Sequence, residues 1–174
     1  SQRSKKLNVK VQEFVAIKTL VDLLLDIDIE TKHFENFFAS FTIEQIGKEF
    51  DLIKLDKGKL VLNIELKSED VGVDVIQNQL EKNRYYLKHL APDVRLYTFV
   101  ESTKELYKYT SKGVKIVELE DLKDTMELLQ KSLGENIESL FQANNYLISP
   151  LNTPSKFMTG DYFLTNQQHD IKKK

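Results

Sequence analysis

The sequence predicts an α/β fold, in which helices and strands alternate along a single chain of 174 residues. Three segments predict it. Residues 9–27 repeat apolar side chains at helical spacing. Residues 59–67 alternate apolar and other side chains with the period of two that a strand requires. Residues 72–90 return to a helical pattern, which we expect to stop near Ala91-Pro92. A chain of this length can bury one substantial core.

The N-terminal part is expected to contain two helices. The first covers residues 9–27, and its apolar stripe is expected to face the core through Val11, Phe14, Val15, Leu20, Val21, Leu24 and Leu25. A second, short helix rich in phenylalanine is expected over residues 28–40.

An antiparallel hairpin is expected next. Residues 49–56 and 59–67 form its strands, and Asp56-Lys57-Gly58 forms the turn. Alternation on the second strand sends Leu60, Leu62, Ile64 and Leu66 to one face, and Lys59, Val61, Asn63, Glu65 and Lys67 to the other.

The rest of the chain divides into a folded part and a tail. We expect a strand, two short strands and a helix at 94–100, 105–109, 114–117 and 119–133. From residue 141 the composition shifts to proline, asparagine, serine, threonine and glycine, which indicates a linker. We therefore predict one domain over residues 1–140 and a separate segment over 141–174.

Composition limits the classes of function. The chain has no cysteine, which excludes disulfides, thiolate metal sites and cysteine catalysis. It shows no secretory signal and no apolar run near the ~18 residues of a membrane span, so we expect a cytoplasmic protein without a membrane partner. The net charge of −2 argues against a nucleic-acid binder. A bound divalent cation would offset that objection, because it brings positive charge to the site where phosphate lies.

The chemistry-bearing pattern is a pair of acids on the two hairpin strands. Antiparallel pairing can bring Asp51 and Glu65 to one end of the same sheet face, where two carboxylates can hold Mg²⁺. Lys67 shares that face, roughly 6.5–7 Å beyond Glu65. A metal that polarises phosphate and an ammonium that stabilises its developing charge are the components of phosphodiester hydrolysis. The alternative is that these alternating charges mark a solvated face.

Polar side chains interrupt the apolar stripe of the helix over 72–90. Gln79 and Asn83 lie one turn apart, within or beside the stripe, and Tyr86 lies near the azimuth of Gln79. Amides embedded among apolar groups need hydrogen-bond partners. They either brace the sheet or, for Gln79, reach the attacking water, the phosphate or Lys67. Tyr86 is either a phosphate contact or, more in keeping with its type, a core aromatic.

These elements together resemble a known superfamily. A helix, Asp51 on a strand, Glu65-x-Lys67 on the next strand and a helix bearing Gln79 resemble the PD-(D/E)XK nucleases. The longer string IGKEFDLIKLDKGKLVLNIELKSED…IQNQLEKNRYYLKHL resembles, more narrowly, nuclease domains at the N-terminus of bacterial helicases. The resemblance covers about residues 33–110. It implies a restriction-endonuclease-like core, with a central mixed sheet flanked by helices.

The resemblance also implies roles for individual residues. Asp51 and Glu65 would bind Mg²⁺ or Mn²⁺, helped by the carbonyl of Leu66. Lys67 would be the catalytic lysine, and Gln79 the following-helix residue of the site.

One departure and one open position accompany these roles. Phe50 stands where the motif often has a proline, which many members lack. Many members also have a glutamate on the preceding helix. Glu35 is the preferred candidate here and Glu30 the second, against the alternative of simple surface charge.

The tail carries a second resemblance. Leu164-Thr165 followed by Gln168 resembles the Q motif of helicases, whose glutamine reads adenine ahead of a P-loop. The chain contains no G-x-x-x-x-G-K-[ST] sequence, so Gln168 could act only with a motor domain that this chain lacks. We therefore expect a covalently linked helicase domain as a partner, against the alternative of a polar tail.

The expected function is metal-dependent hydrolysis of nucleic acid, DNA ahead of RNA, by the nuclease domain of a nuclease–helicase. Anti-phage defence or DNA processing would be its role. Two alternatives stay open: a catalytically inactive module that binds nucleic acid or a protein partner, and an RNase on the same fold. A homodimer also stays open, since nucleases that cut both strands often dimerise.

Overall fold

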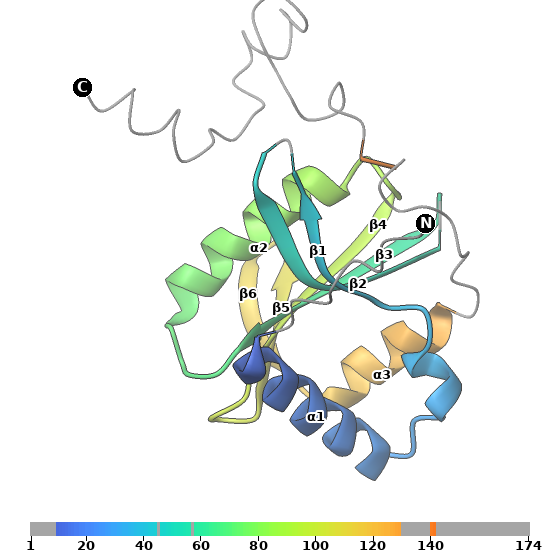
Figure 1. Ribbon diagram of the computed structural model, residues 1–174, viewed down its shortest axis with the longest axis vertical. Coiled ribbons are helices and arrows are strands. Elements are labelled where there is room, and N and C mark those ends of the chain that lie inside the picture. The colour runs from blue at the N-terminus through green and yellow to red at the C-terminus, as the bar shows by residue number, and fades with distance from the viewer. Residues whose placement is uncertain (1–9, 45, 57, 130–139, 142–174) are drawn as a thin grey trace, which may run out of the picture.

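The computed structural model describes residues 10–129, apart from 45 and 57, together with residues 140 and 141. Its centre is a six-stranded sheet whose strands lie side by side in chain order (Figure 1). The parallel pairing of the third and fourth strands makes the sheet mixed, because the other neighbours are antiparallel. The strands are β1 (Phe38–Ile43), β2 (Lys48–Asp56), β3 (Leu60–Lys67), β4 (Asp93–Val100), β5 (Glu105–Thr110) and β6 (Gly113–Val117).

Helices cover both faces of this sheet. Helix α2 (Val73–Leu87) packs on one face, and α1 (Val11–Asp26) and α3 (Leu119–Leu128) pack on the other (Figure 1). Each face has its own apolar cluster, centred on Leu80 and Leu96 under α2 and on Leu20 and Tyr97 under α1 and α3. The predicted α/β class and the mixed sheet flanked by helices are confirmed.

The predicted hairpin is present as β2 and β3, paired antiparallel with Ile53 opposite Asn63. The four alternating leucine and isoleucine side chains of β3 pack under α1 and α3, as expected. On the other face, α2 covers the middle of the strand, where Asn63 is 0 % exposed and Glu65 only 1 %. Lys67 is half-buried and Lys59 is exposed. The alternative of a solvated face is therefore wrong for Glu65.

The orientation of α1 differs from the prediction. Ala16, Leu20 and Leu24 face the sheet, whereas the predicted core residues Val11, Phe14, Val15 and Leu25 are between 40 % and 81 % exposed. In the first half of the helix the buried side chain is thus the small one of Ala16, and the bulkier apolar side chains lie outside. This orientation brings Glu13, three residues before Ala16, to the same side of the helix.

The second predicted helix is wrong for most of its length. Residues 28–40 contain only a short 3₁₀ turn (Thr31–Phe34), and β1 begins at Phe38. Asp28 and Asn36 have φ of 60° and 64°, a left-handed conformation that stops a right-handed helix at each end of the turn.

The later elements follow the prediction with small changes of boundary. Helix α2 ends at Leu87 rather than at residue 90, and α3 ends at Leu128 rather than at residue 133. Of the described helices, none has the length and apolar character that a membrane crossing requires. The predicted linker over 141–174, with Gln168, lies outside the described residues apart from Phe141.

Strand β1 contains an irregular residue opposite the acid of β2. Ser40 has φ of 49° and lies between the pairs Ala39↔Leu52 and Phe41↔Phe50, where a regular ladder would pair it with Asp51. A left-handed residue inside a strand disrupts pairing locally. The ladder is thus interrupted beside Asp51.

Substitution of Ser40 tests this strained position. We expect Ser40→Val to lower the free energy of unfolding by about 1–2 kcal/mol, because a β-branched side chain strongly disfavours positive φ. Ser40→Gly should have the same free energy of unfolding as the wild type or a slightly higher one, because glycine adopts positive φ without strain. Urea titration of the three proteins measures the difference. Equal stability of the valine variant would show that Ser40 is not left-handed in solution.

Candidate active site

The site begins where β2 and β3 separate. Their pairing runs as far as Leu52↔Ile64 and does not include Asp51 and Glu65, which are next in register. Instead, the Asp51 carboxylate accepts a hydrogen bond from the backbone N–H of Leu66, with 2.8 Å between Oδ2 and N. The side chain of Asp51 therefore occupies the gap between the two strands and is fixed there.

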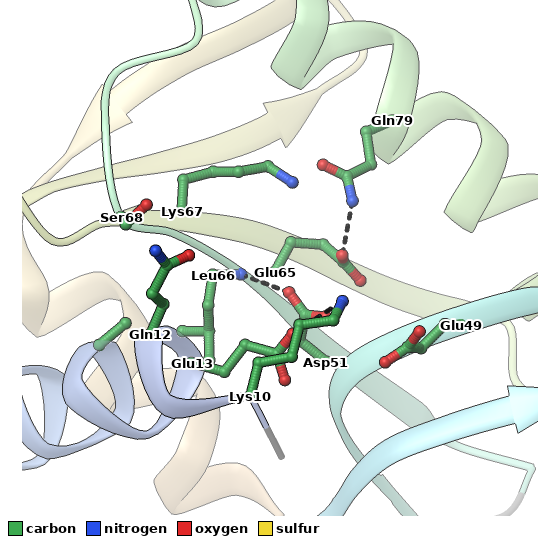
Figure 2. A pocket seen from close by; sticks show the side chains of 11 residues that line it. Lys10, Gln12, Glu13, Glu49, Asp51, Glu65, Leu66, Lys67, Ser68 and Gln79 are labelled. Atoms are coloured by element: carbon green, nitrogen blue, oxygen red, sulfur yellow. Dashed lines mark hydrogen bonds and ion pairs between the residues drawn. The ribbon is translucent and has the colours of Figure 1, made fainter. Parts of the chain in front are cut away.

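Three carboxylates meet beside this gap. Asp51 and Glu49 come from β2 and Glu13 comes from the first turn of α1, and one oxygen from each lies within 4.8 Å of the others. All three are half-buried. They line a hollow of about 340 Å³ that opens between the start of α1 and the ends of β2 and β3 (Figure 2). Such a set of oxygen donors suits a hard divalent cation.

The carboxylate of Glu65 lines the same hollow from its α2 side. It accepts hydrogen bonds from Gln79 at 2.6 Å on Oε2, and from Asn83 at 2.8 Å and Asn63 at 3.0 Å on Oε1. Three amide donors hold it in one orientation. Gln79 and Asn83 therefore brace the sheet, as one of the two interpretations expected, by holding the carboxylate of Glu65. Figure 2 shows the bond from Gln79.

The other predicted residues lie as follows. Lys67 lines the hollow with its side chain on the same side as that of Gln79 (Figure 2). Leu66 also lines it, and its N–H donates to Asp51, while the metal contact expected of its carbonyl stays a prediction. Tyr86 is 9 % exposed and belongs to the apolar cluster under α2, so it is a core aromatic, the second of the two roles considered for it.

The expected upstream glutamate is not at the site. Glu35 and Glu30 line a different hollow, together with His33 and Lys54. Glu13 takes the place that Glu35 was expected to fill, since the preceding helix at this site is α1.

Electrostatics at Asp51 favour a cation. Burial, together with the charges of Glu65 and Glu13, raises the pKa of Asp51 to about 7. The hydrogen bond from the Leu66 N–H and the charge of Lys67 oppose part of this rise. Placing several acids around one partly buried carboxylate is unfavourable unless positive charge joins them. The Lys10 ammonium, 3.4 Å from a Glu13 oxygen, supplies one such charge from the lining of the same hollow. The donor set and its crowding therefore fit a divalent metal ion.

Sequence reasoning missed Glu13 and Glu49. A signal for Glu13 was present in the spacing of Glu13, Ala16, Leu20 and Leu24, which places the acid on the buried face of α1. Glu49 lies two residues before Asp51, so that strand periodicity places both on one face.

The chain was compared with protein-family models, with curated proteins and with solved structures, and none of them matches it.

Proposed function

We propose that this chain hydrolyses phosphodiester bonds in nucleic acid, with DNA as the favoured substrate and Mg²⁺ or Mn²⁺ as its cofactor. The observation that supports the proposal is the convergence of acids from α1, β2 and β3 in one open hollow, with Lys67 beside them. Cation, carboxylates and ammonium are the components that this reaction needs.

Asp51, Glu13 and Glu49 would hold the metal, with Glu65 adjoining them on the α2 side. A bound divalent cation supplies the positive charge that polarises the phosphate and activates water. In the reaction, water adds to phosphorus and the bond from phosphorus to the leaving sugar oxygen breaks, which yields a phosphomonoester and a hydroxyl. The Lys67 ammonium stabilises the negative charge that grows on the phosphate oxygens. Gln79, Asn63 and Asn83 keep the Glu65 carboxylate in place.

The wider role is proposed from the resemblance alone. The chain would be the nuclease domain of a bacterial nuclease–helicase, acting in anti-phage defence or DNA processing. Its partners would be nucleic acid and a covalently linked motor domain.

The test of the function is cleavage by purified protein. Plasmid DNA, single-stranded DNA and RNA are incubated with Mg²⁺ or Mn²⁺, and we expect cleavage of DNA ahead of RNA. Asp51→Ala, Glu65→Ala and Lys67→Ala should each lose it, and Glu35→Ala should keep it. Cleavage of RNA alone would make the chain an RNase. Binding without cleavage in the wild type would instead indicate an inactive binding module.

Metal binding and catalysis should separate among the variants. We expect Glu13→Gln and Glu49→Gln to weaken Mn²⁺ binding by about tenfold each, since each removes one anionic oxygen ligand. Lys67→Ala should bind Mn²⁺ at least as well as the wild type and cleave about 10²–10³-fold more slowly. Isothermal titration calorimetry and a cleavage time course measure the two quantities. Unchanged Mn²⁺ affinity in both glutamate variants would remove them from the metal site.

A further inference from the structure

Lys48, at the start of β2, is a cation that has no carboxylate partner among the described residues. It begins β2, three residues before Asp51, and its side chain is half-buried. Within the described part of the chain, no carboxylate oxygen lies within the 4.0 Å ion-pair distance of its Nζ. Its Nζ lies over the ring of Phe50, 5.0 Å from the ring centroid.

The surroundings of Lys48 connect it with the site. Burial lowers its pKa, the charges of Glu65 and Asp51 raise it, and Lys67 and Lys82 lower it. Phe50 belongs to the apolar cluster under α2, so Lys48, whose Nζ lies 5.0 Å from that ring, is on the same side of the sheet as Glu65, which α2 holds. An ammonium that is partly removed from water and has no direct counter-ion is unfavourable until an anion joins it.

Lys82, on α2, is a second cation. It lies on α2, three residues after Gln79, and one turn of helix therefore separates it from the residue that holds Glu65. Its side chain is exposed, and among the described residues no ion pair is recorded for it either. Lys48 on β2, Lys67 on β3 and Lys82 on α2 are thus three lysines on the α2 side of the sheet, of which Lys67 lines the hollow.

We propose that Lys48 and Lys82 together bind a second phosphate of the substrate strand, next to the phosphate that is cleaved. The proposal rests on the proposed function and specifies its substrate. The site would then bind a nucleic-acid strand that continues beyond the cleaved bond more tightly than a small molecule with a single phosphodiester. The metal and Lys67 serve the reacting phosphate, whereas Lys48 and Lys82 hold the strand in register.

The first arm of the test measures binding without cleavage. A fluorescein-labelled single-stranded oligonucleotide is titrated with protein in Ca²⁺, and anisotropy is followed at several salt concentrations. Lys48→Gln and Lys82→Gln should each raise Kd about tenfold, and together they should lower the slope of log K against log salt by about one. Lys115→Gln is the matched control, because Lys115 is an exposed lysine on β6, at the opposite edge of the sheet.

The second arm measures cleavage of a large and a small substrate with Mn²⁺. Both variants should raise KM for the oligonucleotide about tenfold and leave hydrolysis of bis(p-nitrophenyl) phosphate within about twofold of the wild type. Lys48→Arg should restore most of the oligonucleotide affinity, because it keeps the charge. Thermal unfolding of each variant identifies any that does not fold. If Lys48→Gln does not fold, the oligonucleotide affinity of Lys48→Arg tests the phosphate site instead.

The outcomes separate the two proposals. Variants that bind the oligonucleotide as the wild type does, or no more weakly than Lys115→Gln, overturn the second phosphate site even if cleavage is observed. A wild type that cleaves neither substrate overturns the proposed function, and the binding arm still decides whether Lys48 and Lys82 hold phosphate. A wild type that does not bind the oligonucleotide overturns the phosphate site.

Discussion

Asp51→Asn is expected to lower metal-dependent cleavage by about 10²–10³-fold, because it removes the central anionic ligand of the acidic cluster. The asparagine oxygen can still accept the hydrogen bond from the Leu66 N–H that fixes this side chain at 2.8 Å. The change therefore removes charge and preserves position. Gel assays of plasmid cleavage with Mg²⁺ measure the loss, with Asp56→Asn at the far end of β2 as the control.

The same variant should be more stable than the wild type when no metal is present. The pKa of Asp51 is raised from 3.8 to about 7 by burial and by the charges of Glu65 and Glu13. Between these two values the native state holds a proton that the unfolded state has released. The stabilisation from this carboxyl is therefore full below pH 3.8 and is lost as pH rises to about 7.

Asp51→Asn cannot lose a proton, so it escapes that loss. At about pH 8 and without metal, we expect it to exceed the wild type by about 2 kcal/mol in free energy of unfolding, and the difference should shrink towards pH 4. Saturating Mn²⁺ should reverse the order, since it stabilises only the wild type. A variant less stable than the wild type at high pH without metal would contradict the crowding of acids at this position.

The sequence was informative where periodicity and burial agree. The alternation of β3 predicted the strand, its partner and the faces of its side chains. Successive side chains of a strand point to opposite faces of the sheet, so each residue has only two possible directions. It follows that Asp51, Glu65 and Lys67 could be placed at one end of the sheet. Gln79 could be placed near them, because an amide inside an apolar helical stripe must face the sheet.

The orientation of α1 and the conformation of residues 28–40 depend on tertiary packing, which local sequence patterns do not reveal. The apolar side chains of α1 cover so much of its circumference that two faces of the helix could be buried, and the buried one carries Ala16, Leu20 and Leu24. Glu13 could be assigned to the site only once the buried face was known. The segment from 28 to 40 similarly depends on left-handed residues at Asp28 and Asn36, which the helix-like run of apolar residues does not indicate.

The polar network under α2 leads to the largest expected change in stability. Asn63 is 0 % exposed, and its amide donates to the Leu52 carbonyl and to Glu65 Oε1, both at 3.0 Å. Its oxygen accepts from Asn83 at 2.7 Å. Asn63→Asp changes hardly any volume, yet it removes both donated bonds and places a second carboxylate against Glu65. We expect a loss of about 3–5 kcal/mol at about pH 8.

The loss should depend on pH in a defined direction. A proton shared between the two carboxylates relieves their repulsion and restores a donor, so the folded pair holds a proton to higher pH than the unfolded chain does. The penalty should therefore be smaller at about pH 5 and grow as pH rises. Asn78→Asp, at an exposed position of the same helix, should change stability by less than about 0.5 kcal/mol at either pH. Urea midpoints for both variants decide the matter, because only a buried, amide-held Glu65 makes the first variant pH-sensitive and the second not.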